Sequence, residues 1–448
     1  MFFLRNFRVT IGRQVRLDPN RDNEKILMPS QSLLSRYQAV RTFSEKICAP
    51  LLPEDFVIQS MPDASPAKWH LAHTSWFYET FLLKPHLAEY HSPHPQYDFL
   101  FNSYYNTIGE RHCRPKRGLI SRPTVEDTYA YRAYVDEHMA LLLTGADRDT
   151  LAILEPLLTL GLHHEQQHQE LMVTDLKHLF FDNPLCPVYQ PRRDPPATSV
   201  PEMGWISFEE GVREIGWEGS GFAFDNELPR HKEFLAPFAL GSRLVTNREY
   251  LAFMNSGGYA QPEWWLSEGW SVVQSSGWSS PLCWWDRKGE WMEFTLAGMA
   301  PLNLDAPVCH VSLFEADAYA RWAGARLATE SEWETASVTV PLCGNFADSG
   351  RFHPAALSSE DAEAGKLSQM FGDVWEWTRS QYSPYPGYAP PAGALGEYNG
   401  KFMCNQFVLR GGSCATSHSH MRPTYRNFFP PDARWQFTGI RLAKDNSV

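Results

Sequence analysis

Apolar residues recur every three to four positions along most of residues 30–182, which is the spacing of an amphipathic helix. Four segments carry the pattern strongly enough to predict helices: one that opens at Ser30, then Pro66–Leu83, Thr124–Leu143 and Asp149–Phe181. A proline suits a first helical turn, because its missing N–H has no helical partner there. Four helices of this length predict an antiparallel four-helix bundle.

The pattern changes near Asn183, where the stretch 184–204 holds six prolines and is typical of a linker, placed at 183–200. Beyond it, glycine and tryptophan are frequent and the predicted strands are short. Helical spacing is confined to Asn247–Asn255, Leu313–Ala323 and Ser331–Ser337. The sequence therefore predicts an α+β protein with a helical domain over 30–182, a loop-rich α+β domain over 201–446, and an N-terminal extension over 1–29.

Composition narrows the classes of function. The net charge is −12 and no basic run is present, which argues against a nucleic-acid partner. No stretch of about 18 apolar residues could span a membrane. The eight cysteines are scattered without a CxxC pair, which argues against a cysteine zinc site and favours a reduced, cytoplasmic protein. The N-terminus does not have the pattern of a secretory signal.

The fourth predicted helix contains His164 and His168, which are four residues apart and therefore share one helix face. The second helix contains His70 and His73, and in an antiparallel bundle one of them can face that pair while the other is structural or supports a ligand. Three neutral histidines bind a metal and leave positions for water, oxygen or substrate, as catalytic sites do. Ligand type alone leaves zinc and iron undecided.

Two residues close to His168, Glu170 and Gln167, are expected to point in different directions from the helix axis. Glu170 lies about 200° around the helix from His168, so it is not expected to bind the same metal. Gln167 lies at the edge of the metal-binding face and is predicted to contact substrate.

Several motifs occur in order along both domains. They are WHLAH (69–73), HHEQQHQE (163–170), FAFDNELPRH (222–231), VTNREY (245–250), AGARLATESEWE (323–334), FGDVWEWT (371–378), LRGGS (409–413), and RPTYRNFF (422–429) followed by FTGIRLA. Together they resemble the iron-dependent sulfoxide synthases of ergothioneine biosynthesis, over about residues 34–445. Ala328 departs from the proline that is usual in the family.

This resemblance implies a DinB-like four-helix bundle followed by a C-type-lectin-like domain related to formylglycine-generating enzymes. It implies iron(II) held by His73, His164 and His168, with His73 preferred over His70 because it matches the family ligand. The substrates implied are hercynine (trimethylhistidine), a thiol that is cysteine or γ-glutamylcysteine, and O2. The product would be a sulfoxide with sulfur on C2 of the imidazole.

The second domain refines the expected thiol. Cys414 has no second cysteine nearby, so the copper chemistry of formylglycine-generating enzymes is not expected and Cys414 is predicted to be a buried small residue. Asn427, Phe428 and Phe429 resemble the substrate-contacting segment. Some relatives have Trp-Asp at the two phenylalanine positions, where the Asp binds the amine of γ-glutamylcysteine, so Phe-Phe favours cysteine. Phenyl rings also suit a trimethylammonium group, and core packing is the alternative.

Tyrosines compete for the role of catalytic proton or hydrogen donor. The long loop between the second and third helices contains Tyr104 and Tyr105, which match the Tyr-Tyr pair of cysteine-using relatives. Tyr382, Tyr385 and Tyr388 follow the FGDVWEWT motif in the second domain. Tyr104 is favoured, with Tyr105 beside it, and Tyr388 is assigned to substrate binding.

The same loop contains Arg114 and Arg117, which could grip the substrate carboxylate through paired hydrogen bonds, although plain surface exposure is the alternative. Three other functions stay open. These are the same reaction with γ-glutamylcysteine, an ovothiol-type synthase acting on histidine, and a non-catalytic thiol-binding protein. No glycine-rich methyltransferase motif follows the second domain, which disfavours the ovothiol type.

Overall fold

The computed structural model describes residues 29–192, 200–358, 365–397 and 399–446. Its contacts group residues 29–179 and 390–397 into a helical unit, and residues 180–389 and 399–446 into a second unit. The sequence put 390–397 in the second domain, but Ala394 and Leu395 pack against the helical core. Most of the predicted extension, 1–28, and the linker residues 193–199 lie outside the described residues.

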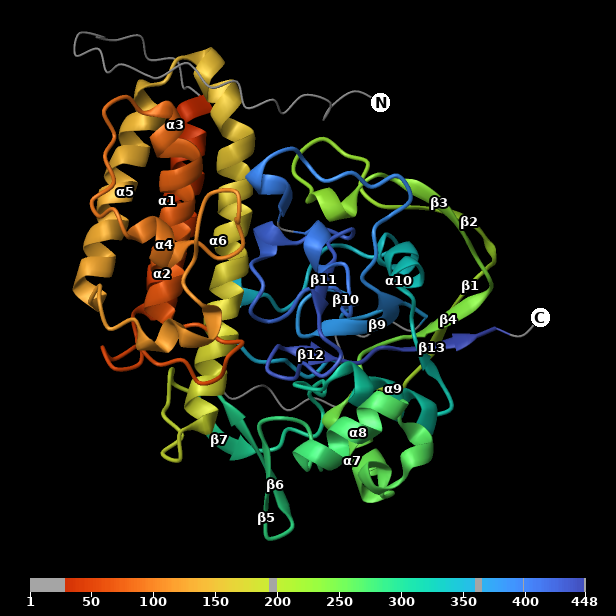
Figure 1. Cartoon of the computed structure of the whole chain (residues 1–448). Coiled ribbons are helices and arrows are strands. Elements are labelled where there is room, and N and C mark those ends of the chain that lie inside the picture. Colours follow the sequence, from red (N-terminus) through yellow and green to blue (C-terminus); the bar gives the residue numbers. More distant parts are fainter. Residues whose placement is uncertain (1–28, 193–199, 359–364, 398, 447–448) are drawn as a thin grey trace. The chain divides into compact units, whose positions relative to one another are not determined.

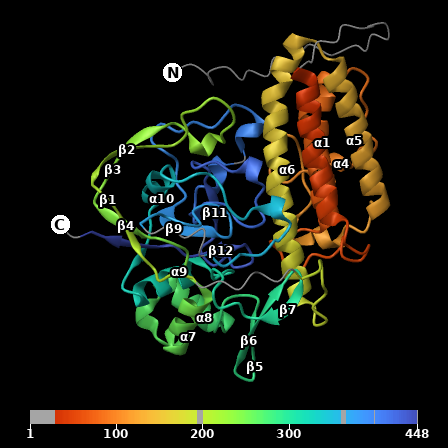
Figure 2. The same cartoon turned by 180° about the vertical axis from the view of Figure 1, so that it is seen from behind.

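Four long helices build the helical unit: α1 (Pro29–Cys48), α2 (Ala67–Tyr78), α5 (Val125–Gly145) and α6 (Arg148–Asp182). Figures 1 and 2 show α1, α5 and α6 side by side. All twelve residues of α2 are buried, which makes it the central helix of the unit. The four predicted helices are thus confirmed. Within the described part of the chain, no helix is both long and apolar enough to cross a membrane.

One difference concerns the predicted helix 66–83. The α-helix ends at Tyr78 and continues as a π-helix over Glu79–Leu83, followed by the short α3 (Lys84–His86). Glu79 is fully buried, and its carboxylate accepts hydrogen bonds from Tyr90 (3.0 Å) and Tyr131 (2.8 Å). Lys84 also pairs with this carboxylate at 3.0 Å, and Tyr131 comes from a distant helix, so helical spacing alone could not predict these contacts. A short helix α4 (Tyr97–Phe101) lies in the long loop before α5.

A buried ion network joins α6 to its neighbours. Glu165 is fully buried and accepts hydrogen bonds from Arg132 of α5 (2.7 Å), and from Arg41 (3.1 Å) and Ser44 (2.6 Å) of α1. Burial alone raises the pKa of a carboxyl group, but Arg132 and Arg41 lower the pKa of Glu165 to about 2. The carboxylate is therefore ionised and paired on both sides.

Among its described residues, the second unit contains four small sheets. One has the order β1 (Trp205–Phe208), β4 (Phe238–Gly241), β13 (Leu442–Asp445), β8 (Arg326–Leu327); another has the order β11 (Asn427–Phe429), β10 (Phe407–Arg410), β9 (Trp375–Gln381), β12 (Thr438–Gly439). The remaining strands are β2 (Gly211–Ile215) with β3 (His231–Leu235), and β5 (Trp284–Arg287), β6 (Glu290–Thr295) and β7 (Gly298–Pro301). The pairs β10–β11, β10–β9 and β13–β4 are antiparallel, whereas β12 pairs with β9 in parallel.

The helices of this unit are α7 (Asn247–Asn255), α8 (Ser267–Ser276), α9 (Leu313–Trp322) and α10 (Glu330–Ser337). Three of them match the predicted segments, and α8 was not predicted. Helices α7, α9 and α10 each begin with a capping box, in which Thr246, Ser312 or Thr329 exchanges hydrogen bonds with a glutamate three residues later. The short strands and the few capped helices agree with the predicted loop-rich α+β domain.

Candidate metal centre

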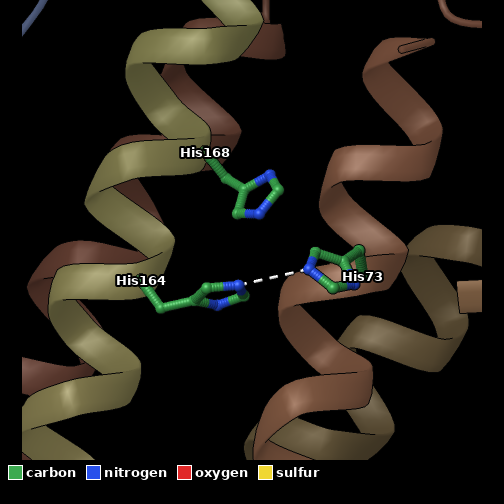
Figure 3. Close-up of side chains that lie close together, drawn as sticks. All are labelled: His73, His164 and His168. Carbon is green, nitrogen blue, oxygen red and sulfur yellow. Dashed lines mark hydrogen bonds between the residues drawn. The ribbon is translucent and has the colours of Figure 1, made fainter. Parts of the chain in front are cut away.

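Three histidines from two helices meet inside the helical unit (Figure 3). His164 and His168 are one turn apart on α6, and His73 projects from α2. One ring nitrogen from each residue lies within 4.8 Å of the others, and all three side chains are buried. The ring centroids are 4.6 Å apart for His73–His168 and His164–His168, and 4.9 Å for His73–His164. The structure thus brings together the set predicted from the sequence.

The close approach of α2 and α6 depends on Gly161, three residues before His164. A Cβ at this position would lie 2.6 Å from Tyr78 and 3.1 Å from Phe77, both on α2. A side chain here would push the helices apart, so glycine is required by the packing and not by helix preference.

The imidazole rings of His73, His164 and His168 favour the neutral form, in which one ring nitrogen can donate a lone pair to a metal. Burial lowers the pKa of His164 to about 4, and it holds the pKa values of His73 and His168 well below the ordinary range. Nδ1 of His73 lies 2.5 Å from the carbonyl oxygen of Phe101 and donates to it, since a carbonyl can only accept. Its Nε2 therefore presents a lone pair to the cluster.

Aromatic side chains hold two of these rings in place. Trp69 and Trp76 stack on His73, with centroids 4.6 Å and 5.6 Å away and interplanar angles of 12° and 16°. Phe77 stacks on His164 at 4.5 Å and 26°. The two tryptophans and Phe77 are buried, so they also keep water from one side of the cluster. Sequence spacing did not identify these supporting residues.

The nitrogen donors fit a divalent transition metal. Nε2 of His164 lies 3.2 Å from Nε2 of His73, and Nδ1 of His164 is buried without a hydrogen-bond partner among the described residues. If Nε2 of His164 carries the proton, the lone pair on its buried Nδ1 has no hydrogen-bond donor among the described residues. If Nδ1 carries the proton instead, the Nε2 lone pairs of His73 and His164 face each other and repel. A cation shared by the Nε2 atoms removes that repulsion.

Within the described part of the chain, these three residues are the one group of His, Cys, Asp or Glu arranged to hold a metal ion. His70 does not join the group; its Nδ1 lies 2.8 Å from Nδ1 of His168. Gln167 is half-buried on α6, between the two histidines of that helix. Three protein donors are the number found in catalytic sites, where further positions accept substrate or water.

The loop before α5 places its tyrosines and arginines near one another. Arg114 donates a hydrogen bond to the Tyr104 hydroxyl at 2.7 Å, and Tyr105 is buried against Trp76 and Phe81. Arg117 is buried, with its guanidinium 3.3 Å from the centre of the Trp69 ring. The alternative of plain surface exposure is therefore wrong for Arg117.

The hydrogen-bond partners of Arg117 are uncharged, although the Asp175 carboxylate acts on it electrostatically. Arg117 donates to the hydroxyls of Ser65 (2.9 Å) and Ser103 (3.0 Å), and its Nε is buried without a hydrogen-bond partner among the described residues. Burial lowers the pKa of Arg117 to about 9. A buried guanidinium that hydrogen-bonds only neutral groups can still gain from a further anionic partner.

The predicted residues of the second unit lie on and beside β11. Asn427, Phe428 and Phe429 form this strand and are half-buried; Phe428 stacks on Tyr382 with centroids 4.0 Å apart and planes 10° from parallel. Tyr388 donates a hydrogen bond to Asp225 at 2.8 Å. Cys414 is fully buried, as predicted.

Comparison with known proteins gives the family. The model of the sulfatase-modifying factor enzyme 1-like domain matches residues 190–360 and 345–446. The chain is 34% identical over 420 residues to the hercynine oxygenase of Mycolicibacterium smegmatis, which covers 86% of this chain and 92% of that protein. The chain belongs to the hercynine oxygenase family.

Further relatives agree with the hercynine oxygenase assignment. The hercynine oxygenase of Mycobacterium tuberculosis is 33% identical over 410 residues, with 86% of this chain and 92% of that protein covered. The ergothioneine biosynthesis protein 1 of Schizosaccharomyces pombe is 27% identical over 253 residues, which are 54% of this chain and 29% of that protein. The family resemblance inferred from the motifs is thereby confirmed, as is a second domain of the sulfatase-modifying-factor type.

Proposed function

We propose that this hercynine oxygenase family member is an iron(II)-dependent sulfoxide synthase of ergothioneine biosynthesis, which joins cysteine to C2 of hercynine with O2. The observation that carries the proposal is the buried cluster of neutral His73, His164 and His168, in a chain that matches hercynine oxygenases along most of its length. The helical unit is proposed to be of the DinB-like type.

The reaction has a simple balance. The thiol loses its S–H hydrogen, hercynine loses its C2–H hydrogen, and a C–S bond forms between them. One atom of O2 becomes the sulfoxide oxygen, and the other leaves as water with the two hydrogens. Four electrons pass to O2: two as the C–S bond forms and two as sulfur is oxidised.

His73, His164 and His168 would hold the iron, and iron(II) would supply oxygen activation and a shared binding point for both substrates. The other residues bind, orient and move protons. Tyr104 is proposed to donate the proton or hydrogen that the reduced oxygen requires, with Tyr105 beside it. Arg114 donates a hydrogen bond to the Tyr104 hydroxyl and is also proposed to bind substrate. Gln167 is proposed to bind hercynine.

Arg117 is the better supported of the two proposed carboxylate anchors. Its hydrogen bonds go to neutral hydroxyls and its Nε has no hydrogen-bond partner among the described residues, so a substrate carboxylate could bind it in addition to the nearby Asp175 charge. Asn427, Phe428, Phe429 and Tyr388 are proposed to bind substrate as well. The phenyl rings suit the trimethylammonium group of hercynine, and the absence of a carboxylate at these two phenylalanine positions favours cysteine over γ-glutamylcysteine.

The test is reconstitution with iron(II) followed by reaction with hercynine, O2, and an equimolar mixture of cysteine and γ-glutamylcysteine. Mass spectrometry identifies the product, and metal analysis gives the iron content. His73→Ala should lose both iron and product. His138→Ala is the matched control, because His138 is a half-buried bundle histidine that hydrogen-bonds only a backbone carbonyl in the described contacts. Full iron content and activity in His73→Ala would overturn the proposal.

A further inference from the structure

His70 links a metal-binding histidine to a buried carboxylate. Nδ1 of His70 lies 2.8 Å from Nδ1 of His168, and its Nε2 lies 3.1 Å from Oδ2 of Asp175. His70 is 2% exposed and Asp175 6% exposed, so water does not compete strongly for these contacts. The same Oδ2 accepts the backbone N–H of Ser65 at 2.8 Å.

The position of Asp175 follows from the helix. It lies seven residues after His168 on α6, which is close to two full turns, so both side chains project from the same face. His70 comes from α2, one turn before His73. The two helices thus supply a continuous chain of three side chains, His168–His70–Asp175, inside the helical unit.

The chemistry of the three side chains fixes which atom donates in each hydrogen bond of the series His168–His70–Asp175. A carboxylate can only accept, so Nε2 of His70 carries a proton and donates it to Asp175. The neutral ring then has its lone pair on Nδ1, which accepts from Nδ1–H of His168. With the proton on Nδ1, Nε2 of His168 carries the lone pair that a metal requires. The opposite direction would put a proton on Nε2 of His168 and block it as a ligand.

We infer that His70 and Asp175 are positioning residues that fix the metal-binding tautomer and the ring orientation of His168. The inference rests on the proposed function, because it assumes that His168 binds a metal. The three ligands are supported differently: His73 by the Phe101 carbonyl, His168 by the His70–Asp175 pair, and His164 by no described hydrogen bond at Nδ1. His168 is therefore the ligand whose donor strength is set by a buried carboxylate.

The test measures the affinity for Fe(II) and Co(II) in full-length protein without oxygen, by competition with a coloured chelator. His70→Phe keeps a ring of similar shape and removes both nitrogens. It should weaken metal binding by about 10- to 100-fold, the usual effect of losing a partner behind a histidine ligand. Asp175→Leu should have a similar effect. Asp175→Asn keeps an acceptor oxygen and should stay closer to the wild-type protein.

The double variant His70→Phe/Asp175→Leu separates a relay from two independent packing effects. Because Asp175 acts on His168 through His70, the double variant should bind metal no more weakly than His70→Phe alone. His70→Gln should restore part of the affinity, since its amide can accept from His168 and donate to Asp175. His178→Gln is the control: His178 is a half-buried histidine on the same helix, hydrogen-bonded to Ser60, and its change should leave affinity unaltered.

The outcomes distinguish failure of the proposed metal site from failure of the proposed role of His70. Wild-type protein that binds no metal would overturn the proposed function. Wild-type protein that binds metal, with His70→Phe binding equally tightly, would overturn only the role of His70. Fold changes that multiply in the double variant would overturn the relay. Circular dichroism of the metal-free variants checks folding, and if His70→Phe does not fold, Asp175→Leu and His70→Gln carry the same comparison.

Discussion

The indole of Trp69 lies parallel to the imidazole of His73, with centroids 4.6 Å apart and planes at 12°. Trp69 is buried, its Nε1 donates to the carbonyl oxygen of Leu100 at 3.1 Å, and the Arg117 guanidinium lies 3.3 Å from its ring centre. One side chain therefore supports a proposed metal ligand and a proposed substrate anchor.

Removing this ring should affect both stability and metal binding. Trp69→Ala should lower the free energy of unfolding by about 3–5 kcal/mol, through lost burial and a residual cavity. It should also weaken Fe(II) binding, because His73 loses its stacking partner. Urea unfolding followed by circular dichroism, together with chelator competition, measures the two effects. Trp69→Phe keeps a stacking ring and is the control, and equal stability of the two variants would contradict the argument.

Tyr104 should matter for the chemical step and not for metal binding. Its hydroxyl oxygen accepts a hydrogen bond from Arg114 at 2.7 Å, which orients the side chain. Tyr104→Phe should lower kcat by about 10²- to 10⁴-fold, the usual contribution of a positioned proton donor. Iron content should not change. If Tyr105→Phe shows the larger loss in parallel assays, the roles of the two tyrosines are reversed.

Thiol selectivity should respond to a single change on β11. Phe429 is half-buried, with its ring at 80° to that of Trp435 and centroids 5.8 Å apart. Phe429→Asp introduces a carboxylate at the position proposed to lie near the thiol substrate, and a charge-assisted contact to the amine of γ-glutamylcysteine is worth about tenfold or more in relative rate. Competition between the two thiols measures the shift. Phe429→Leu is the control, and no shift towards γ-glutamylcysteine in Phe429→Asp would refute the proposed contact.

The segment that leads into β11 should be sensitive to acid through Glu330. This buried carboxylate accepts from Arg426 at 2.8 and 2.9 Å and from Arg410 at 3.2 Å. Burial alone raises the pKa of a carboxyl group, but the two guanidinium groups hold the pKa of Glu330 below its ordinary value of 4.5. The ion pairs therefore stabilise the fold above that pH, and this stabilisation is lost as the pH falls through the lowered pKa.

Glu330→Gln leaves the buried Arg426 guanidinium without its carboxylate, whereas Arg410 keeps Glu334 at 2.8 Å. The loss of one buried ion pair should cost about 3–5 kcal/mol at neutral pH. The difference between the wild-type and variant proteins should shrink below pH 4.5. Thermal unfolding at several pH values measures both, and a difference that stays constant into acid would contradict the assignment.

The sequence predicted the elements whose signals are local. Helical spacing located α1, α2, α5 and α6, and the four-residue interval placed His164 and His168 on one face. The π-helix after Tyr78 was not predicted, and its buried Glu79 pairs with Tyr131 of a distant helix, a contact that helical spacing alone does not give. The choice between His70 and His73 came from family resemblance, and spacing left it open.

Other parts of the site depend on packing between helices. Asp175 could have been noticed as an acidic residue two turns after His168, but only the structure shows His70 between them. Trp76 and Gly161 look like ordinary core positions in the sequence; their importance lies in how closely α2 and α6 approach. The grouping of residues 390–397 with the helical unit likewise depends on contacts with no local pattern.

The Glu165 network has a consequence for the orientation of the metal ligands. Consecutive helical residues point about 100° apart, so Glu165 and its neighbour His164 cannot change direction independently. Any roll of α6 about its long axis that swung His164 away from His73 would also pull a buried anion from Arg41 and Arg132. The ionic contacts of α6 with α1 and α5 thus limit rotation of α6, and the direction of its imidazoles is set partly by these two neighbouring helices.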